Sequence, residues 1–202
     1  VTVTLATPEG EPIEGEHGYR YEGDAPIVDV HADEVHCLVL PGGRSPERLR
    51  KDAPVAVDVT RRCVEGDAVV AAICHGPQLL ASADLLDGRQ VACYPGIADD
   101  VEHAGATYVD EPVVVDGTIV TSRLPEDLPA FMRETTTKLQ RVLAQLVKEV
   151  RRRPEGERAQ LLEGCRHNLE RERTFIEGMQ AALESPDAGE MDGALADMLN
   201  AL

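Results

Sequence analysis

The chain has 202 residues, with 37 acidic and 20 basic side chains and a formal net charge of −17. Such a charge argues against nucleic acid or an anionic membrane surface as a partner, and no apolar run is long enough to span a membrane. The length suits one domain with an appendage or two small domains, and because aromatic residues make up only 3%, the core must consist mostly of Val, Leu, Ala and Ile.

Strands and helices alternate along the first 150 residues. In chain order we expect a strand at 1–6, a short hairpin arm through Tyr19 and Tyr21, a strand at 35–40, a helix at 46–63 interrupted near Pro54, a strand at 69–73 and a helix at 75–86. Then follow a strand at 90–93, a helix at 97–104, strands at 107–109, 113–115 and 118–121, and a long helix at 126–150. Between the last two strands, Asp116-Gly117 is a strong signal for a two-residue hairpin turn.

This alternation predicts an α/β sandwich of three layers, in which helices cover both faces of a mostly parallel sheet. In such sheets, binding and catalytic sites lie beyond the carboxyl ends of the strands. Gly43 and Cys74 each follow a predicted strand at that end. We therefore expect the functional site to form around these two positions.

The last third of the chain has a different character. Residues 151–156 form a charged helix breaker, after which we expect a helix at 157–184, a turn at 185–189 and a helix at 191–202. Residues 1–150 are therefore predicted to form the α/β domain and residues 151–202 a helical C-terminal extension. The extension is interpreted as a solvated appendage that packs on the core or on another subunit, and a partner-docking arm is the functional alternative.

Cys74 is the strongest candidate for a catalytic residue. It lies between the buried strand at 69–73 and the helix that begins with His75, so the turn exposes its thiol. Unpaired N–H groups at a helix start favour the thiolate, which is the nucleophilic form, and a neighbouring histidine can act as a general base. The pattern is the cysteine counterpart of the serine nucleophile elbow, in which adjacent N–H groups form an oxyanion hole.

Several segments together resemble the PfpI intracellular protease family, in the DJ-1/PfpI branch of the class I glutamine amidotransferase-like superfamily. They are Ala71–Leu80 (AAICHGPQLL), Leu38–Arg50 (LVLPGGRSPERLR), Tyr94–Asp100 (YPGIADD), Val113–Arg123 (VVVDGTIVTSR) and Leu128–Phe131 (LPAF). The resemblance covers about residues 1–145 in the family's order and spacing, and it implies a flavodoxin-like fold. Jointly the motifs are specific, although each one alone is weak.

The resemblance also implies roles for individual residues. Cys74 is the nucleophile, His75 moves the proton, and the N–H groups of Gly43 and His75 form the oxyanion hole. Glu47 corresponds to a glutamate that reaches the histidine of a neighbouring subunit and completes a triad, which requires a homo-oligomer. The candidates for the substrate pocket are Tyr94, His17 and Gly42.

No cofactor is required for this chemistry, and no metal is expected. The remaining histidines show no spacing typical of metal ligands; they are His31, His36, His103 and His167. The expected partners are therefore a peptide or a small carbonyl substrate and further copies of the chain.

The start of the chain departs from the resemblance. Val1 corresponds to the family's second strand, so the first strand, its helix and a carboxylate near the nucleophile are missing. In a doubly wound sheet the first strand is central, and its loss leaves unpaired strand edges. We expect the sequence to be a fragment that lacks roughly 30–40 residues, enough for a strand–helix unit. The alternative is a shortened, inactive relative.

The composition indicates the compartment. Lysine occurs three times, and an acidic, lysine-poor surface is typical of a salt-rich cytoplasm; an ordinary acidic protein from a GC-rich genome is the alternative. Five cysteines, an odd number without CxxC spacing, favour free thiols in a reducing cytoplasm. Cys37 and Cys93 lie in apolar strand patterns, and we expect both to be buried structural thiols.

The function predicted from the sequence is that of a cytoplasmic cysteine hydrolase of the intracellular peptidase type. A second possibility uses the same site, with the thiolate attacking an aldehyde or hemithioacetal in glyoxalase or deglycase chemistry. A third is a stress-linked holdase or redox sensor in which Cys74 is oxidised rather than turned over. The elbow motif alone does not separate them.

Overall fold

The computed structural model describes residues 2–15 and 18–157. Residues 3–147 form one compact unit, and the end of α5 from Lys148 is assigned to a second unit. Residues 158–202 lie outside the described part of the chain. They include the helices predicted at 157–184 and 191–202, except for residue 157, and the turn predicted between them. The predicted boundary near residue 150 stays a prediction.

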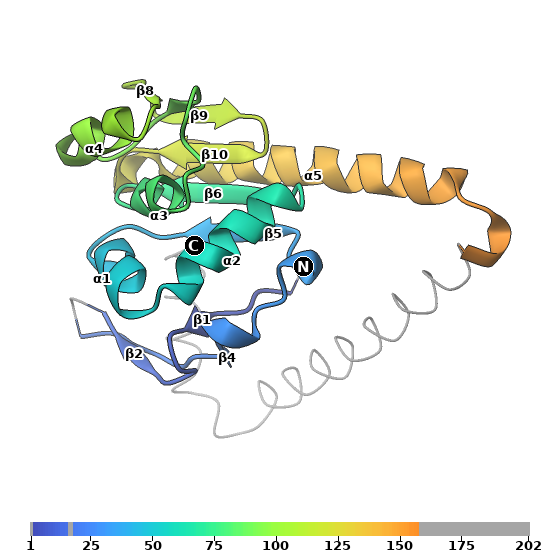
Figure 1. The fold of residues 1–202 in the computed structure, drawn as a ribbon, viewed down its shortest axis with the longest axis horizontal. Helices are drawn as coiled ribbons and strands as arrows, with labels where there is room; N and C mark the ends of the chain where they lie inside the picture. The colour runs from blue at the N-terminus through green and yellow to red at the C-terminus, as the bar shows by residue number, and fades with distance from the viewer. Residues whose placement is uncertain (1, 16–17, 158–202) are drawn as a thin grey trace, which may run out of the picture. The chain divides into compact units, whose positions relative to one another are not determined.

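A four-stranded sheet lies at the centre of the compact unit (Figure 1). Its strand order is β5 (Cys37–Leu40), β6 (Val69–Ile73), β10 (Ile119–Ser122) and β9 (Val113–Asp116). The pairs β5–β6 and β6–β10 are parallel, and β9–β10 is the antiparallel hairpin predicted from Asp116-Gly117. The mostly parallel sheet predicted from the sequence is confirmed.

The sequence of β6, Val-Val-Ala-Ala-Ile, suits a central strand that is buried on both faces. Val70 and Ala72 belong to an apolar cluster that contains residues of α2 (Val55–Glu65) and α3 (Pro77–Ser82). Val69 and Ala71 belong to a second cluster with Phe131 of α5 (Leu128–Arg152). Figure 1 shows α2 and α3 on one side of the sheet and α5 on the other, so the three predicted layers are present.

The helices differ in detail from the sequence predictions. The helix predicted at 46–63 is two helices, α1 (Ser45–Asp52) and α2, and the break falls at Ala53-Pro54 as expected. The helix predicted at 75–86 is shorter at both ends: α3 begins at Pro77, because His75 and Gly76 belong to the turn after β6, and it ends at Ser82 before Asp84 adopts a positive φ of 57°. A short helix α4 (Ala98–His103) matches the prediction at 97–104, and a 3₁₀ turn precedes α5.

The strand predicted at 1–6 is largely wrong. Of the described residues 2–6, only Ala6 belongs to a strand, β1 (Ala6–Thr7), which pairs with the parallel β4 (Ala25–Pro26) that the sequence did not indicate. Val3, inside the predicted strand, is 72% exposed, so its alternating pattern does not reflect a buried face. β1 and β5 lie in separate sheets, and β5 pairs within the described residues only with β6.

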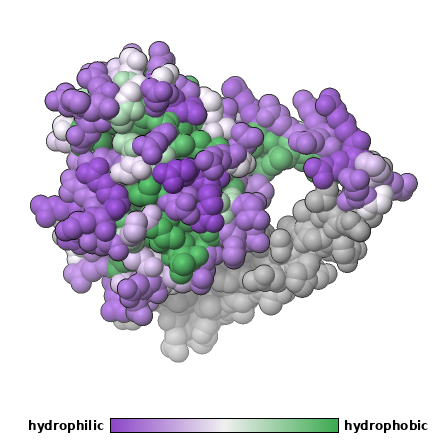
Figure 2. Space-filling view, in the orientation of Figure 1, coloured by the Kyte–Doolittle hydropathy of each residue, from purple (hydrophilic) through white to green (hydrophobic). Residues whose placement is uncertain are grey.

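Two further sheets have two strands each. The predicted hairpin arm is present as the antiparallel pair β2 (Ile13–Glu14) and β3 (Arg20–Tyr21). The pair β7 (Gln90–Val91) and β8 (Thr107–Tyr108) is parallel and shorter than predicted. Figure 2 shows hydrophilic residues over most of the visible face, with apolar residues emerging between them. Among the described helices, none is both long and apolar enough to cross a membrane.

Candidate active site

Cys74 occupies a strained turn directly after β6. Its φ is +61°, a left-handed conformation that costs a non-glycine residue about 1–2 kcal/mol. Two hydrogen bonds hold it there: the Cys74 N–H donates to the Ser122 carbonyl at 2.9 Å, and the Cys74 carbonyl accepts from the Tyr94 N–H at 2.9 Å. The turn therefore fixes the position from which the thiol projects, as the elbow motif predicted.

Two glycines allow the backbone to pack closely around this turn. A Cβ added at Gly42 would lie 2.6 Å from Cys74 Cβ and 3.2 Å from Cys74 Sγ. A Cβ at Gly76 would collide with the Leu40 carbonyl oxygen at the end of β5. The structure places Gly42 against the nucleophile, and its predicted role in the substrate pocket stays a prediction. Gly76 was not singled out, although a glycine two positions after the candidate nucleophile was a usable signal.

His75 lies next to the thiol in space as well as in sequence. Its Nδ1 is 3.3 Å from Cys74 Sγ, a hydrogen-bonding distance for sulfur. Simple geometry did not guarantee this contact, because adjacent side chains normally point apart. The imidazole stacks on the ring of Tyr94, with centroids 4.8 Å apart and planes inclined by 23°. Tyr94 therefore orients His75, since its ring fixes the plane of the imidazole.

A glycine supports the Tyr94 ring from its own loop. A Cβ added at Gly96 would lie 2.6 Å from Tyr94 Cε1, so only glycine lets the backbone pass beside this ring. Tyr94 is 39% exposed and does not line the cavity described below. Its predicted place in the substrate pocket stays a prediction.

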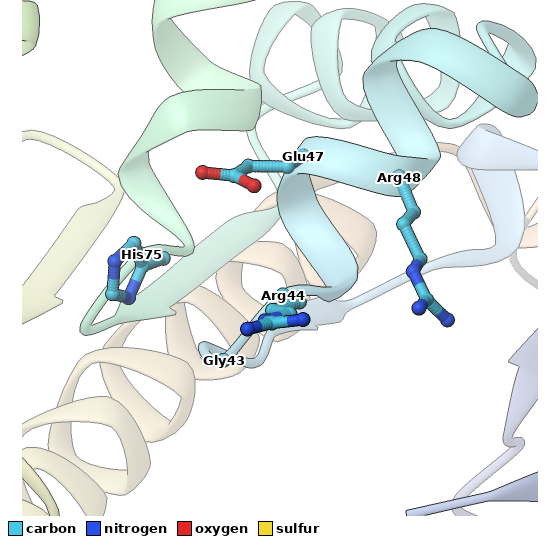
Figure 3. A pocket seen from close by; sticks show the side chains of 5 residues that line it. All are labelled: Gly43, Arg44, Glu47, Arg48 and His75. Atoms are coloured by element: carbon cyan, nitrogen blue, oxygen red, sulfur yellow. The ribbon is translucent and has the colours of Figure 1, made fainter. Parts of the chain in front are cut away.

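An open cavity of about 650 Å³ lies beside the elbow and is lined by Gly43, Arg44, Glu47, Arg48 and His75 (Figure 3). Cys74 is not among the lining residues, but its Sγ contacts the Nδ1 of the lining His75. The cavity joins the residues that follow β5 to those that follow β6, because parallel neighbours end at the same edge of the sheet.

The predicted oxyanion donors lie at this edge. Gly43 is exposed, with φ +66° and open space around its Cα. In the described part of the chain, neither the Gly43 N–H nor the His75 N–H donates to a protein acceptor. Both donors are therefore available to a substrate oxygen.

Glu47 is exposed on α1 and extends toward the His75 side of the cavity in Figure 3. Its carboxylate makes no ion pair or hydrogen bond with His75 among the described residues. The predicted contact of Glu47 with a neighbouring subunit stays a prediction. His17 lies outside the described residues. Within the described ranges, no three His, Cys, Asp or Glu side chains gather as a metal site.

A scan of known protein families matches residues 1–138 to the DJ-1/PfpI family. The chain belongs to this family. A deglycase from Pyrococcus horikoshii is 48% identical over 132 residues, which are 65% of this chain and 79% of that protein. The Bacillus subtilis protein named "Putative cysteine protease YraA" is 43% identical over 133 residues, 66% of this chain and 78% of that protein.

Among solved structures, a two-domain protein from Anabaena variabilis with DJ-1/ThiJ/PfpI-like and ferritin-like domains is 38% identical, with a TM-score of 0.62. The match covers 68% of this chain and 39% of the longer protein. The flavodoxin-like fold predicted from the sequence is thereby confirmed, and so is the family that the motifs suggested.

The other described thiols of this DJ-1/PfpI domain are poor nucleophiles. Burial raises the pKa of Cys63 to about 11 and that of Cys93 to about 12. Burial also raises the pKa of Cys37, which is half-buried rather than buried as predicted. Cys93 is fully buried, as expected, and Cys165 lies outside the described residues. Cys74 alone among the four described thiols borders a cavity-lining histidine.

An ion-pair cluster that sequence reasoning missed anchors the segment after β10. Arg123 donates from Nε and Nη2 to the Asp127 carboxylate at 3.0 and 3.3 Å, and from Nη1 to Asp110 at 2.6 Å. These hydrogen bonds raise the pKa of Arg123 above its ordinary value. The Ser122 carbonyl accepts a hydrogen bond from the Cys74 N–H. The cluster therefore stabilises the end of β10 that holds the turn at Cys74.

Proposed function

We propose that this chain is a cysteine-dependent deglycase that clears carbonyl adducts by acting on 2-oxoaldehydes. The observation that carries the proposal is the 3.3 Å contact of Cys74 Sγ with His75 Nδ1 at a strained elbow beside an open cavity. The similarity to a relative named deglycase supports the choice of substrate chemistry. A reducing cytoplasm, which keeps thiols free, is the compartment that we propose for it.

The first step is addition of the thiol to the aldehyde carbon. His75 Nδ1 takes the thiol proton, a C–S bond forms, and the carbonyl electron pair moves to oxygen. The N–H groups of Gly43 and His75 are the donors proposed to stabilise that oxygen. Their availability within the described chain supports this role.

In the second step, protonated His75 first returns its proton to the oxyanion, and a base then takes the C–H proton from the former aldehyde carbon to form an enediolate. The base gives that proton to the neighbouring carbon while the hydroxyl proton passes to the neighbouring oxygen, which leaves a thioester. His75 and Glu47 are the cavity groups able to carry this proton. Water then attacks the thioester, the C–S bond breaks, and a 2-hydroxy acid leaves with Cys74 restored. Because the free aldehyde is in equilibrium with its amine and thiol adducts, its removal also reverses glycation.

A cysteine peptidase is the second candidate, supported by the name of the Bacillus relative. The same thiol would attack an amide carbonyl, and His75 would give its proton to the leaving amine. In this reading Glu47 completes a triad, which requires the homo-oligomer predicted from the sequence.

The deciding experiment compares the wild type with Cys74→Ala and with Cys37→Ala, a matched change at a half-buried thiol outside the site. Purified proteins are assayed in high salt against methylglyoxal, with 2-hydroxy acid as the measured product, and against a fluorogenic peptide. We expect methylglyoxal turnover by the wild type and Cys37→Ala and none by Cys74→Ala. Turnover of the peptide alone would favour the peptidase, and turnover that survives Cys74→Ala would overturn both proposals.

A further inference from the structure

The cavity beside Cys74 has the opposite charge sign to the whole chain. The formal net charge is −17, yet the lining of the cavity holds two arginines, Arg44 and Arg48, against one carboxylate, Glu47. Proton transfer from Cys74 to His75 leaves the pair neutral, so the excess positive charge comes from the arginines. In so acidic a protein, a positively charged cavity at the reactive centre indicates that the ligand is an anion.

Both guanidinium groups are available to a ligand. Arg44 and Arg48 are exposed, and within the described residues neither has a carboxylate oxygen within 4.0 Å. A guanidinium presents paired N–H donors that match the two oxygens of a carboxylate, which makes arginine well suited to bind this group. Among residues 2–15 and 18–157, no ion pair of Arg44 or Arg48 has to be broken first.

The two arginines occupy different places in the cavity. In Figure 3, Arg44 lies beside Gly43, next to the proposed oxyanion donor, whereas Arg48 lies one turn further along α1 and points away from His75. The first turn of α1 has no side-chain cap, so its free N–H groups add to the positive potential on this side. Glu47 lies between Arg48 and His75 and opposes that potential.

We propose that the carbonyl substrate of this site carries a carboxylate, and that Arg44 binds the carboxylate while Arg48 attracts it from the rim. The inference rests on the proposed function, since it names the substrate class of the same site: 2-oxoaldehydes with a carboxylate at the other end. Arg44 is a specificity-determining residue in this scheme, and it takes no part in proton transfer.

The first test uses two alkylating reagents of nearly equal size, iodoacetate and iodoacetamide, which differ in charge. Rates of Cys74 alkylation are measured for both, and their ratio reports the potential at the thiol independently of any turnover. We expect Arg44→Gln to lower the iodoacetate-to-iodoacetamide ratio about three- to tenfold, Arg48→Gln to lower it less, and Glu47→Gln to raise it. The iodoacetamide rate in each variant reports whether the elbow is intact.

Arg50→Gln is the matched control, because Arg50 is exposed on the same helix but does not line the cavity. Its ratio should stay at the wild-type value, and the Arg44 effect should shrink as salt is raised. An unchanged ratio in Arg44→Gln, or an equal loss in Arg50→Gln, would overturn the inference.

The second test measures turnover of 4,5-dioxovalerate against 2-oxopentanal, which share the reactive dicarbonyl and chain length and differ in the terminal carboxylate. The wild type should prefer the carboxylate in kcat/KM, and Arg44→Gln should lose about tenfold on that substrate alone. Equal kcat/KM values in the wild type would overturn the inference while leaving the deglycase proposal intact. If neither aldehyde is turned over, the deglycase proposal fails, and the alkylation ratio still decides whether the cavity selects anions.

Discussion

Gly42→Ala is expected to displace the nucleophile. The new Cβ would lie 2.6 Å from Cys74 Cβ, 3.1 Å from the Ile73 carbonyl oxygen and 3.2 Å from Cys74 Sγ. Carbon atoms in favourable contact are about 3.5–4.0 Å apart, so either the Gly42 loop or Cys74 must move by about 1 Å. Overpacking of this kind costs about 1–3 kcal/mol of folding stability. A shift of that size at a catalytic group can lower the rate about 100-fold.

Chemical denaturation would measure the stability of Gly42→Ala, and iodoacetamide kinetics would measure the reactivity of Cys74. Gly88→Ala is the control, because Gly88 has a φ of +71° and open space, so it carries backbone strain without a clash. That control should lose about 1 kcal/mol of stability and keep wild-type reactivity. In a double-mutant cycle, Cys74→Gly removes the two Cys74 atoms that clash and leaves only the contact with the Ile73 carbonyl oxygen, so the cost of Gly42→Ala should fall by about 1 kcal/mol or more in that background. Wild-type alkylation and turnover in Gly42→Ala would refute the reasoning.

Three further predictions follow from the described contacts. With limiting iodoacetamide at neutral pH, peptide mapping should find Cys74 labelled first, because the other three described thiols have raised pKa values; preferential labelling of any of them would contradict the assignment. The pKa of Cys93 is raised from 9.0 to about 12, so the native state retains a proton that the unfolded state loses above pH 9. The difference in the free energy of unfolding between the wild type and Cys93→Ala should therefore be constant below pH 9 and fall by about 1.4 kcal/mol per pH unit from pH 9 to pH 12. A difference that does not change with pH would contradict the raised pKa of Cys93. Asp127→Asn should lower the Tm more than Asp110→Asn, since the Asp127 side chain is 8% exposed and that of Asp110 69%, and equal shifts would show that burial of the Arg123 pair is immaterial.

The sequence predicted most of the central sheet because its signals are local. The continuous apolar run of β6 and the Asp116-Gly117 turn each depend on neighbouring residues alone. The pairing of β1 with β4 could not be predicted from the sequence, because strands of two residues are too short to show an alternating pattern. The exposed Val3 shows the converse, an alternating pattern without a buried face.

Much of the candidate site could be predicted for a topological reason. Gly43, Glu47, Cys74 and His75 come from two segments, and the carboxyl ends of adjacent parallel strands bring such segments together. The stack of Tyr94 on His75 could not be predicted, since it depends on the path of a loop that follows a different strand. The roles of Gly42 and Gly76 depend on close contacts between segments in the folded chain, which no spacing in the sequence encodes.

The strained backbone of Cys74 is held by hydrogen bonds to two other segments of the chain. Its N–H is held by the end of β10 and its carbonyl by the segment after β7, so the turn is clamped by two partners that are far apart in sequence. The hydrogen bonds make the position rigid, and their combined contribution is comparable with the strain of about 1–2 kcal/mol. His75 is fixed in turn by the Tyr94 ring, whose own N–H makes one of those two bonds. The thiol, its proton acceptor and the ring behind that acceptor therefore form one connected unit, and a change in the Tyr94 loop should disturb Cys74 reactivity without touching the sulfur.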